Sequence, residues 1–394
     1  MRENSQLSTS RRSQTLGLSG IREIFEKAQR IPDVIRLEFG EPDFDTPSNI
    51  KEAAILAINK GHTKYSSSSG IPELRSAISE KLKHDNKVDY SASREVVVTA
   101  GATSAINLAL QATLDVGDEI LVPDPGWATY VHAVNLIGAA PVLYPLLEAE
   151  EFQFSAETAE RYVSPKTRAI LINTPANPMG SILPRKNVQA IAEFALRHNL
   201  YVISDEVYEK FLYEDGEPRE HVSIASLSEM KDRTVTINAL SKTYAMTGWR
   251  IGYAASSTEI AGAMTKINAA ASSCVSTIAQ YAALEALTGP QDSVAKMITT
   301  FAQRRRIMVD GLNEFDGFKC SMPKGAFYAF PNIEGTGMSS KDLAMRIIDE
   351  AHVATVPGTA FGKQGEGHLR IAYANSIENI QNALDRMKKI LRTN

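Results

Sequence analysis

Short apolar segments alternate with amphipathic segments along most of the chain. REVVVTAGA, RAILINTPANP and LYVISDEVY have the length and the β-branched content of buried strands. Between such runs lie TSAINLALQAT and NVQAIAEFALRHN, whose apolar residues recur at helical spacing. This alternation predicts an α/β fold with a mostly parallel, doubly wound sheet.

The pattern changes near residue 290. Residues 292–315 have the pattern of one long helix, and GFKCSMPKGAFYAFPN has that of a β-rich stretch. Apolar residues at helical spacing predict further helices over 20–31, over 340–351 and at the C-terminal end, SIENIQNALDRMKKILR. HLRIAYAN (368–375) alternates like a half-buried strand, so this part of the chain mixes helices and strands.

These two patterns predict two domains in a chain of 394 residues. The large α/β domain is predicted to span 48–290. A smaller α+β domain combines the N-terminal segment, 1–47, with 291–394. The first residues, MRENSQLSTSRRSQ, are polar and lack the apolar core of a signal peptide, so we expect a solvated tail.

Charge and composition exclude several classes of protein. The formal net charge is −4, which argues against a polyelectrolyte partner such as nucleic acid or an anionic membrane. No apolar run approaches the ~20 residues that a membrane-spanning helix needs. Cys274 and Cys320 form at most one pair, so a disulfide scaffold is excluded and a reducing compartment is favoured. The histidines lack metal-ligand spacing. We therefore expect a soluble, cytoplasmic protein without a metal site.

Polar residues follow the predicted strands at their carboxyl ends, where open α/β sheets bind ligands. VVVT ends at Gly101-Ala102-Thr103, where small residues at a helix start expose backbone N–H groups and form a candidate phosphate cradle. Taken alone, a glycine at such a turn is more often structural. Arg250, in GWR, offers a planar fork that suits a phosphate.

The next three strands end in an amide, a carboxylate and an amine. Asn177 lies between two prolines in PANP, Asp205 is followed by Tyr208 in SDEVY, and Lys242 follows Ser241 in SKTY. Each has a purely structural interpretation, such as a rigid turn, a helix cap or a solvated loop lysine. Together with the phosphate cradle they suit a pyridinium cofactor with a phosphate tail, because a carboxylate keeps the ring nitrogen protonated and a lysine forms a Schiff base.

AGATSA, PANP, SDEVY and SKTYAMTGWR, in this order, closely resemble the fold-type-I aminotransferases of the aspartate aminotransferase superfamily. GEPDFDTP and LRIA also match, and the resemblance covers nearly the whole chain. It implies a fold-type-I architecture and transamination with pyridoxal 5'-phosphate (PLP) as cofactor.

The resemblance implies a role for each residue around the cofactor ring. Lys242 carries PLP as a Schiff base and moves the proton between the substrate Cα and the cofactor. Asp205 pairs with the pyridine nitrogen. Tyr208 and Asn177 bond the ring hydroxyl, and Trp127 stacks on the ring face.

The resemblance also implies how the phosphate and the substrate are bound. Arg370 clasps the substrate α-carboxylate, helped by the Gly40 backbone and Asn177. Tyr65 reaches the phosphate of the neighbouring subunit, so the active unit is expected to be a homodimer. The remaining phosphate ligands are Gly101, Ala102, Thr103, Ser241 and Arg250.

Several alternatives stay open at this point. Carbon–sulfur β-lyases and cyclopropane-forming synthases use the same scaffold, and a regulator could reuse the fold without its chemistry. Aspartate with 2-oxoglutarate is the first choice of substrates, with aromatic amino acids or alanine next. Some relatives acting on dicarboxylates place a basic residue just after the phosphate-loop threonine, where this chain has Ser104.

Overall fold

The computed structural model describes residues 9–14, 20–214 and 220–391. Most of the expected solvated tail, residues 1–8, lies outside the described residues. Within its remainder, Arg11–Gln14 form a short helix, α1, on which Ser13 and Gln14 are exposed.

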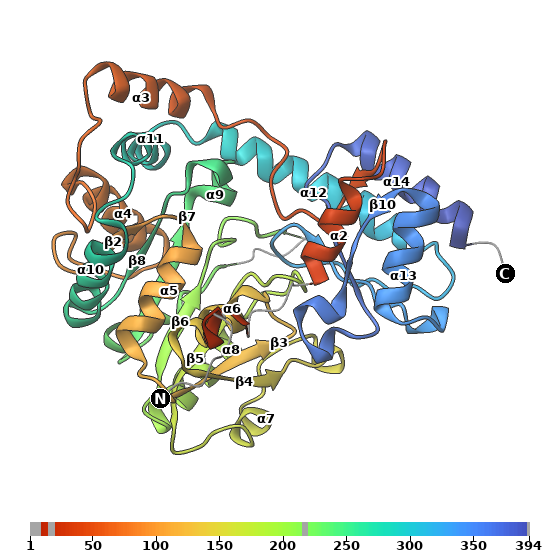
Figure 1. Ribbon diagram of the computed structural model, residues 1–394, viewed down its shortest axis with the longest axis horizontal. Helices are drawn as coiled ribbons and strands as arrows, with labels where there is room; N and C mark the ends of the chain where they lie inside the picture. Colours follow the sequence, from red (N-terminus) through yellow and green to blue (C-terminus); the bar gives the residue numbers. More distant parts are fainter. Residues whose placement is uncertain (1–8, 15–19, 215–219, 392–394) are drawn as a thin grey trace, which may run out of the picture.

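A seven-stranded sheet forms the centre of the larger part of the molecule (Figure 1). Its strands are parallel except for β8, which pairs antiparallel with both neighbours. The predicted mostly parallel sheet is therefore confirmed. In spatial order the strands are β2 (Val96–Thr99), β8 (Gly252–Ala255), β7 (Thr234–Ala239), β6 (Tyr201–Asp205), β5 (Thr167–Asn173), β3 (Glu119–Asp124) and β4 (Ala140–Pro145).

Helices cover both faces of this sheet because the strand side chains alternate between two hydrophobic clusters. In β5, Ala169 and Leu171 belong to one cluster, and Ile170 and Ile172 belong to the other. The first cluster includes side chains of α5 (Ala102–Thr113), α6 (Thr129–Ile137) and α10 (Thr258–Ser272). The second includes α7 (Ala156–Glu160) and α8 (Arg185–Arg197). A third joins β2 and β8 to α3 (Ser48–Asn59), α4 (Pro72–Asp85) and α11 (Thr277–Thr288).

The C-terminal part builds a second, smaller assembly of strands and helices. Three short strands form an antiparallel sheet in the order β11 (Val356–Pro357), β12 (Leu369–Ala372) and β9 (Tyr328–Ala329). In a separate parallel pair, β1 (Ile35–Arg36) from the N-terminal segment joins β10 (Val353–Ala354). The helices of this part are α2 (Gly20–Ala28), α12 (Asp292–Leu312), α13 (Ser340–Arg346) and α14 (Ile377–Leu391).

One hydrophobic cluster joins the N-terminal segment to the C-terminal part. Ile24 and Leu37 belong to it together with Phe301, Ile371 and Met387. Helix α12 extends from the sheet side of the molecule to the C-terminal helices (Figure 1). The same cluster includes Tyr208 and Phe211 of the predicted large domain, and the domain boundaries at 47/48 and 290/291 stay a prediction.

Three elements differ from the sequence-based expectation. The β-rich stretch before residue 333 contains only the two-residue strand β9, because Pro323 and Pro331 cannot donate to a ladder. The helix predicted over 340–351 is α-helical only to Arg346 and continues as a π-helical turn. The HLRIAYAN strand is fully buried rather than half-buried, since β12 lies between two other strands and its polar residue, Arg370, is covered.

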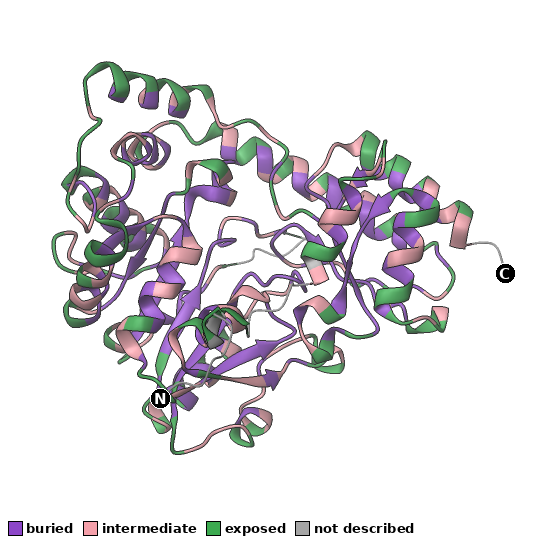
Figure 2. Ribbon diagram, in the orientation of Figure 1, coloured by how far each residue is buried: buried purple, intermediate pink, exposed green. Residues whose placement is uncertain are grey.

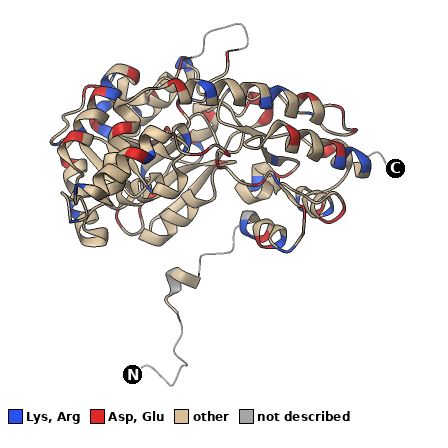
Figure 3. Cartoon of the chain, turned by 90° about the horizontal axis from the view of Figure 1, so that it is seen from above, with Lys and Arg blue, Asp and Glu red and all other residues tan. Residues whose placement is uncertain are grey.

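The surface of the described residues carries charges of both signs. Figure 2 shows the central strands buried and the outer faces of the helices exposed. Lys and Arg residues are interspersed with Asp and Glu residues along those helices (Figure 3). Cys274 and Cys320 are free thiols. Within the described ranges, no helix combines the length and apolar character needed to span a bilayer.

Candidate active site

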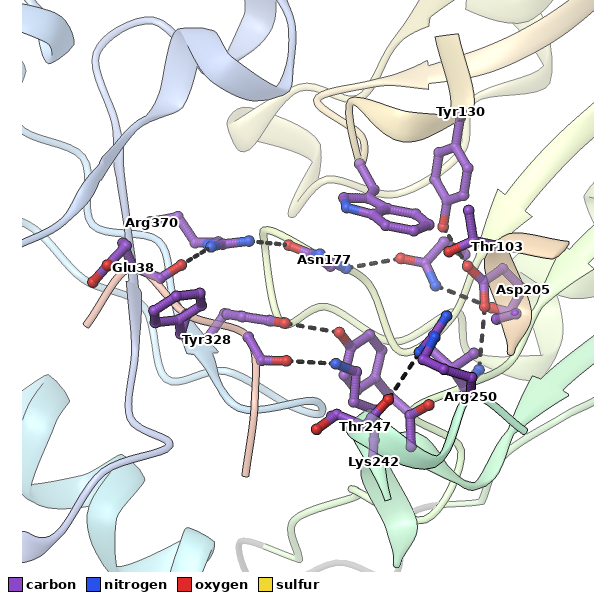
Figure 4. Close-up of a pocket in the computed structure, with 18 residues that line it drawn as sticks. Glu38, Thr103, Tyr130, Asn177, Asp205, Lys242, Thr247, Arg250, Tyr328 and Arg370 are labelled. Atoms are coloured by element: carbon purple, nitrogen blue, oxygen red, sulfur yellow. Dashed lines mark hydrogen bonds between the residues drawn. The ribbon is translucent and has the colours of Figure 1, made fainter. Parts of the chain in front are cut away.

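A cavity of about 300 Å³ lies beyond the carboxyl ends of the parallel strands (Figure 4). Asn173 and Asp205 end strands β5 and β6, and Lys242 follows β7 on the four-residue helix α9 (Leu240–Thr243). Apart from Gly101 and Tyr65, every residue predicted for the site lines this cavity. These lining residues are Gly40, Ala102, Thr103, Trp127, Asn177, Asp205, Tyr208, Ser241, Lys242, Arg250 and Arg370.

Lys242 presents its amine to this cavity. The Nζ atom donates a short hydrogen bond to the carbonyl oxygen of Gly40. Burial, together with the positive charges of Arg370 and Arg250, lowers the pKa of Lys242 to about 8, against the opposing charge of Glu41. A much larger fraction of this amine is therefore neutral near pH 8 than in an ordinary lysine, as a nucleophile requires.

Asp205 is a buried carboxylate that lines the same cavity, with 2% of its surface exposed. Tyr130 Oη donates to Asp205 Oδ2 at 2.6 Å, and the Val207 N–H donates to Oδ1 at 3.3 Å. Burial raises the pKa of Asp205 to about 6, although both hydrogen bonds lower it. A buried carboxylate held in this way favours a cationic partner.

The turn from β2 into α5 brings backbone N–H groups and a guanidinium together. Gly101 has a φ of 81° and provides no side-chain cap, so the first N–H groups of α5 have no side-chain acceptor at its N-cap. A Cβ atom at Gly101 would lie 2.6 Å from Arg250 Nη2, so only glycine fits here. Arg250 is fixed by a 2.9 Å hydrogen bond to the Thr247 carbonyl oxygen. This arrangement suits a phosphate group.

Arg370 comes from strand β12 on the other side of the cavity. Its Nη1 donates to Asn177 Oδ1 at 3.1 Å, and its Nη2 donates to the Glu38 carbonyl oxygen. The guanidinium lies 4.8 Å from the ring centroids of both Tyr328 and Phe361. Its buried Nε has no hydrogen-bond partner among the residues that the structure describes. Two hydrogen bonds and two aromatic rings therefore fix this guanidinium in the wall of the cavity, where its charge suits an anionic ligand.

Trp127 and Tyr208 complete the walls of the cavity. Trp127 packs edge-on against Tyr130, with ring centroids 5.4 Å apart. Tyr208 is buried, and its hydroxyl bonds the hydroxyl of Tyr328 at 2.7 Å. Burial raises the pKa of Tyr208 well above its ordinary value, so this hydroxyl keeps its proton and remains a donor.

Tyr65 lies away from the cavity. Its side chain is 88% exposed, and together with Cys274 and Thr277 it lines a separate surface hollow. Gly101 is also absent from the lining, but it contacts the cavity residue Arg250 as described above.

The cavity also contains residues that the sequence patterns did not indicate. Tyr130 lies in the first turn of α6, three residues after Trp127, and this closeness in sequence to a predicted site residue was the one available signal. Tyr328 had no such signal, because its partner Tyr208 is 120 residues away in sequence. The further lining residues are Glu38, Phe39, Asn173, Val207 and Thr247.

Next to Asp205, three potential metal ligands form a buried polar network. Ligand atoms of Glu206, Glu209 and His221 lie within 4.8 Å of one another. His221 Nε2 and Glu206 Oε2 are 2.8 Å apart, while Asn86 Nδ2 donates to both carboxylates and Lys81 Nζ donates to Glu209. Protein donors therefore occupy these groups, which fix the loop after β6.

Comparison with known proteins agrees with this geometry. The family described as aminotransferase class I and II matches residues 32–387. An aspartate aminotransferase of Pyrococcus abyssi is 46% identical over 95% of this chain and 96% of its own. Aromatic-amino-acid aminotransferase 2 of Thermococcus litoralis is 44% identical over 98% of this chain and 99% of its own.

A solved structure extends the likeness to three dimensions. The aromatic aminotransferase from Pyrococcus horikoshii superposes with a TM-score of 0.89 at 44% identity, over 94% of this chain and 98% of that one. The resemblance to the fold-type-I aminotransferases is thereby confirmed. This chain belongs to the aminotransferases of class I and II.

Proposed function

We propose that this aminotransferase binds pyridoxal 5'-phosphate beside Lys242 and exchanges an amino group between an L-amino acid and a 2-oxo acid. The proposal rests on one observation: a single cavity brings together an amine, a buried carboxylate and two guanidinium groups. These are Lys242, Asp205, Arg250 and Arg370. When bound, PLP supplies an aldehyde that condenses with amines and a pyridinium ring that accepts electrons.

The donors and acceptors around the cavity fit this cofactor. The start of α5, Ser241 and Arg250 offer N–H, hydroxyl and guanidinium donors for the phosphate. Asp205, whose pKa burial raises to about 6, gains a cationic partner if it faces a protonated ring nitrogen. Tyr208 and Asn177 provide neutral donors for the ring oxygen, and Trp127 provides an apolar face.

Three residues of the cavity then have separate roles in the reaction. Arg370 binds the substrate α-carboxylate, with its orientation fixed by Asn177 and by the rings on both sides of it. Lys242 takes the proton from the substrate Cα and returns it on the cofactor side, acting as a general base and acid. Asp205 holds a proton on the ring nitrogen throughout.

As substrates we propose aspartate as the amino donor and 2-oxoglutarate as the acceptor. The names of several relatives support this choice, including that of the Pyrococcus abyssi enzyme. One observation favours an aromatic donor as a second candidate. Phe39 lines the cavity and packs edge-on against Phe25 at 5.2 Å between ring centroids. Among the described lining residues, the cations are Lys242, Arg250 and Arg370, all of which already have roles.

A direct assay tests the function. Purified protein mixed with PLP should absorb visible light, and borohydride should bleach it and fix the cofactor on the peptide that contains Lys242. A panel of amino donors with 2-oxoglutarate should yield glutamate, fastest with aspartate or, for the second candidate, with phenylalanine or tyrosine. Turnover without PLP, or label on another lysine, would contradict the proposal. Pyruvate and ammonia formed without an oxo acid would instead indicate a β-lyase.

We further propose that the active unit is a homodimer in which Tyr65 donates to the phosphate bound by the partner chain. Support comes from its 88% exposure beside a helix, α3, whose Ile55, Leu56 and Ile58 are exposed by 57%, 52% and 50%. Apolar residues exposed on one helix are typical of a surface that another chain covers.

Tyr65→Phe tests this arrangement. Because the variant loses one hydrogen bond to a charged group, the dissociation constant of PLP should rise about tenfold. Sedimentation equilibrium should give twice the mass of one chain for both proteins. An active monomer, or unchanged PLP affinity in the variant, would refute the shared site.

A further inference from the structure

Tyr328 connects the strand that carries Arg370 to the large sheet. In the pairing of β9 with β12, Tyr328 lies opposite Ala372, so Tyr328 and Arg370 are diagonal neighbours on one face of the small sheet. The ring of Tyr328 covers the guanidinium at 4.8 Å. Its side chain, with 1% of the residue exposed, is fixed in this place by packing.

The hydroxyl of Tyr328 reaches across the cavity to the loop after β6. It bonds the hydroxyl of Tyr208 at 2.7 Å, and the two rings are nearly perpendicular, with centroids 5.7 Å apart. Both residues are buried, so no bulk water competes for this hydrogen bond.

The same hydroxyl leaves no space for a side chain at position 40. A Cβ atom at that position would lie 2.1 Å from Tyr328 Oη. The Gly40 carbonyl oxygen in turn accepts the hydrogen bond from Lys242 Nζ. Tyr328 therefore contacts three separate parts of the site: the strand of Arg370, the backbone beside Lys242, and Tyr208.

We propose that Tyr328 is a positioning residue, whose hydroxyl holds the Tyr208 hydroxyl in place and strengthens it as a hydrogen-bond donor toward the cofactor ring oxygen. This inference rests on the proposed function, in which Tyr208 bonds that oxygen. A hydroxyl that accepts one hydrogen bond donates a stronger one, because the two bonds polarise each other. In the holoenzyme, Tyr328 donates to Tyr208, and Tyr208 donates to the ring oxygen.

Tyr328→Phe removes the hydroxyl and keeps the ring over Arg370. If Tyr208 is a weaker donor, it stabilises negative charge on the cofactor ring oxygen less. The proton shared between that oxygen and the nitrogen that joins Lys242 to the cofactor is then lost only at a higher pH. The midpoint of the pH titration of the visible absorption band should therefore rise by about half a unit. Tyr213→Phe is the matched control, since this buried tyrosine donates to the Ala326 carbonyl oxygen and does not line the cavity.

A double-mutant cycle shows whether Tyr328 acts through Tyr208. In a Tyr208→Phe background, adding Tyr328→Phe should leave the midpoint unchanged. An equal shift in both backgrounds, or a shift no larger than that of Tyr213→Phe, would overturn the proposal. If Tyr328→Phe does not fold, 3-fluorotyrosine at position 328 keeps the ring and the hydroxyl and makes that hydroxyl a stronger donor, so the midpoint should fall below the wild-type value; an unchanged or higher midpoint would likewise overturn the proposal. Absence of a titrating band in the wild-type protein would instead count against the proposed function.

Discussion

Lys242→Ala is expected to lower kcat by at least about 10⁴-fold, because it removes a nucleophile and the group that moves the proton. The amine is the only one among the described cavity-lining residues, so no neighbour can replace it. Steady-state turnover with aspartate and 2-oxoglutarate measures the loss, and the circular dichroism spectrum checks that the fold is kept.

Two controls distinguish the loss of the reactive amine from the loss of a positive charge at position 242. Lys242→Arg keeps a cation at the site but cannot act as the base at neutral pH, so it should be as inactive as the alanine variant. A small primary amine added to Lys242→Ala should restore part of the proton transfer, because the truncated side chain leaves space beside the Gly40 carbonyl oxygen. Full activity of either variant without added amine would show that another group moves the proton.

The lowered pKa of Lys242 gives this prediction a pH dependence. The free amine attacks, and burial lowers its pKa from the ordinary 10.5 to about 8. Below pH 8 most of the amine is protonated and unreactive. The rate at which the apoprotein captures PLP should therefore rise about tenfold per pH unit up to pH 8 and level off above it. Stopped-flow absorbance measures this rate.

The cavity residues that follow the parallel strands could be placed from the sequence because local patterns set their positions. Buried β-branched runs mark β5, β6 and β7, and the residues that follow them share one edge of a parallel sheet. For Asn177, Asp205 and Lys242, chain order alone therefore indicated that they meet. Gly101 was also a local signal, since its positive φ and its contact with Arg250 both require glycine.

The residues that bridge distant segments could not be predicted in the same way. Tyr328 lies in a strand of two residues, too short to give a periodic pattern, and it acts on Tyr208 through a hydroxyl. The carbonyl oxygen of Glu38 holds Arg370, and a backbone acceptor leaves no trace in side-chain identity. Tyr65 lies on the surface of one chain, so one chain alone does not show what it contacts.

Asp205→Asn is expected to lower kcat/KM by about 10²- to 10³-fold, comparable to the loss of a preorganised charge-stabilising group in other enzymes. The substitution preserves shape and leaves an oxygen to accept the hydrogen bond from Tyr130 Oη. What it removes is the negative charge that, in the proposed function, keeps the ring nitrogen of the cofactor protonated. The defect should therefore lie in kcat more than in the KM of the amino donor, since Arg370 still binds the carboxylate.

Tyr130→Phe provides the matched comparison, because it removes the hydrogen bond that Asp205→Asn keeps and keeps the charge that Asp205→Asn removes. Without that bond the pKa of Asp205 should rise, since the hydrogen bond from Tyr130 lowers it. Activity of Tyr130→Phe should thus fall only at the acidic end of the pH profile, where the carboxylate takes up a proton. Asp205→Asn should be impaired at every pH. Equal losses at all pH values in both variants would mean that Asp205 serves to anchor the loop after β6, and that its charge does not drive the reaction.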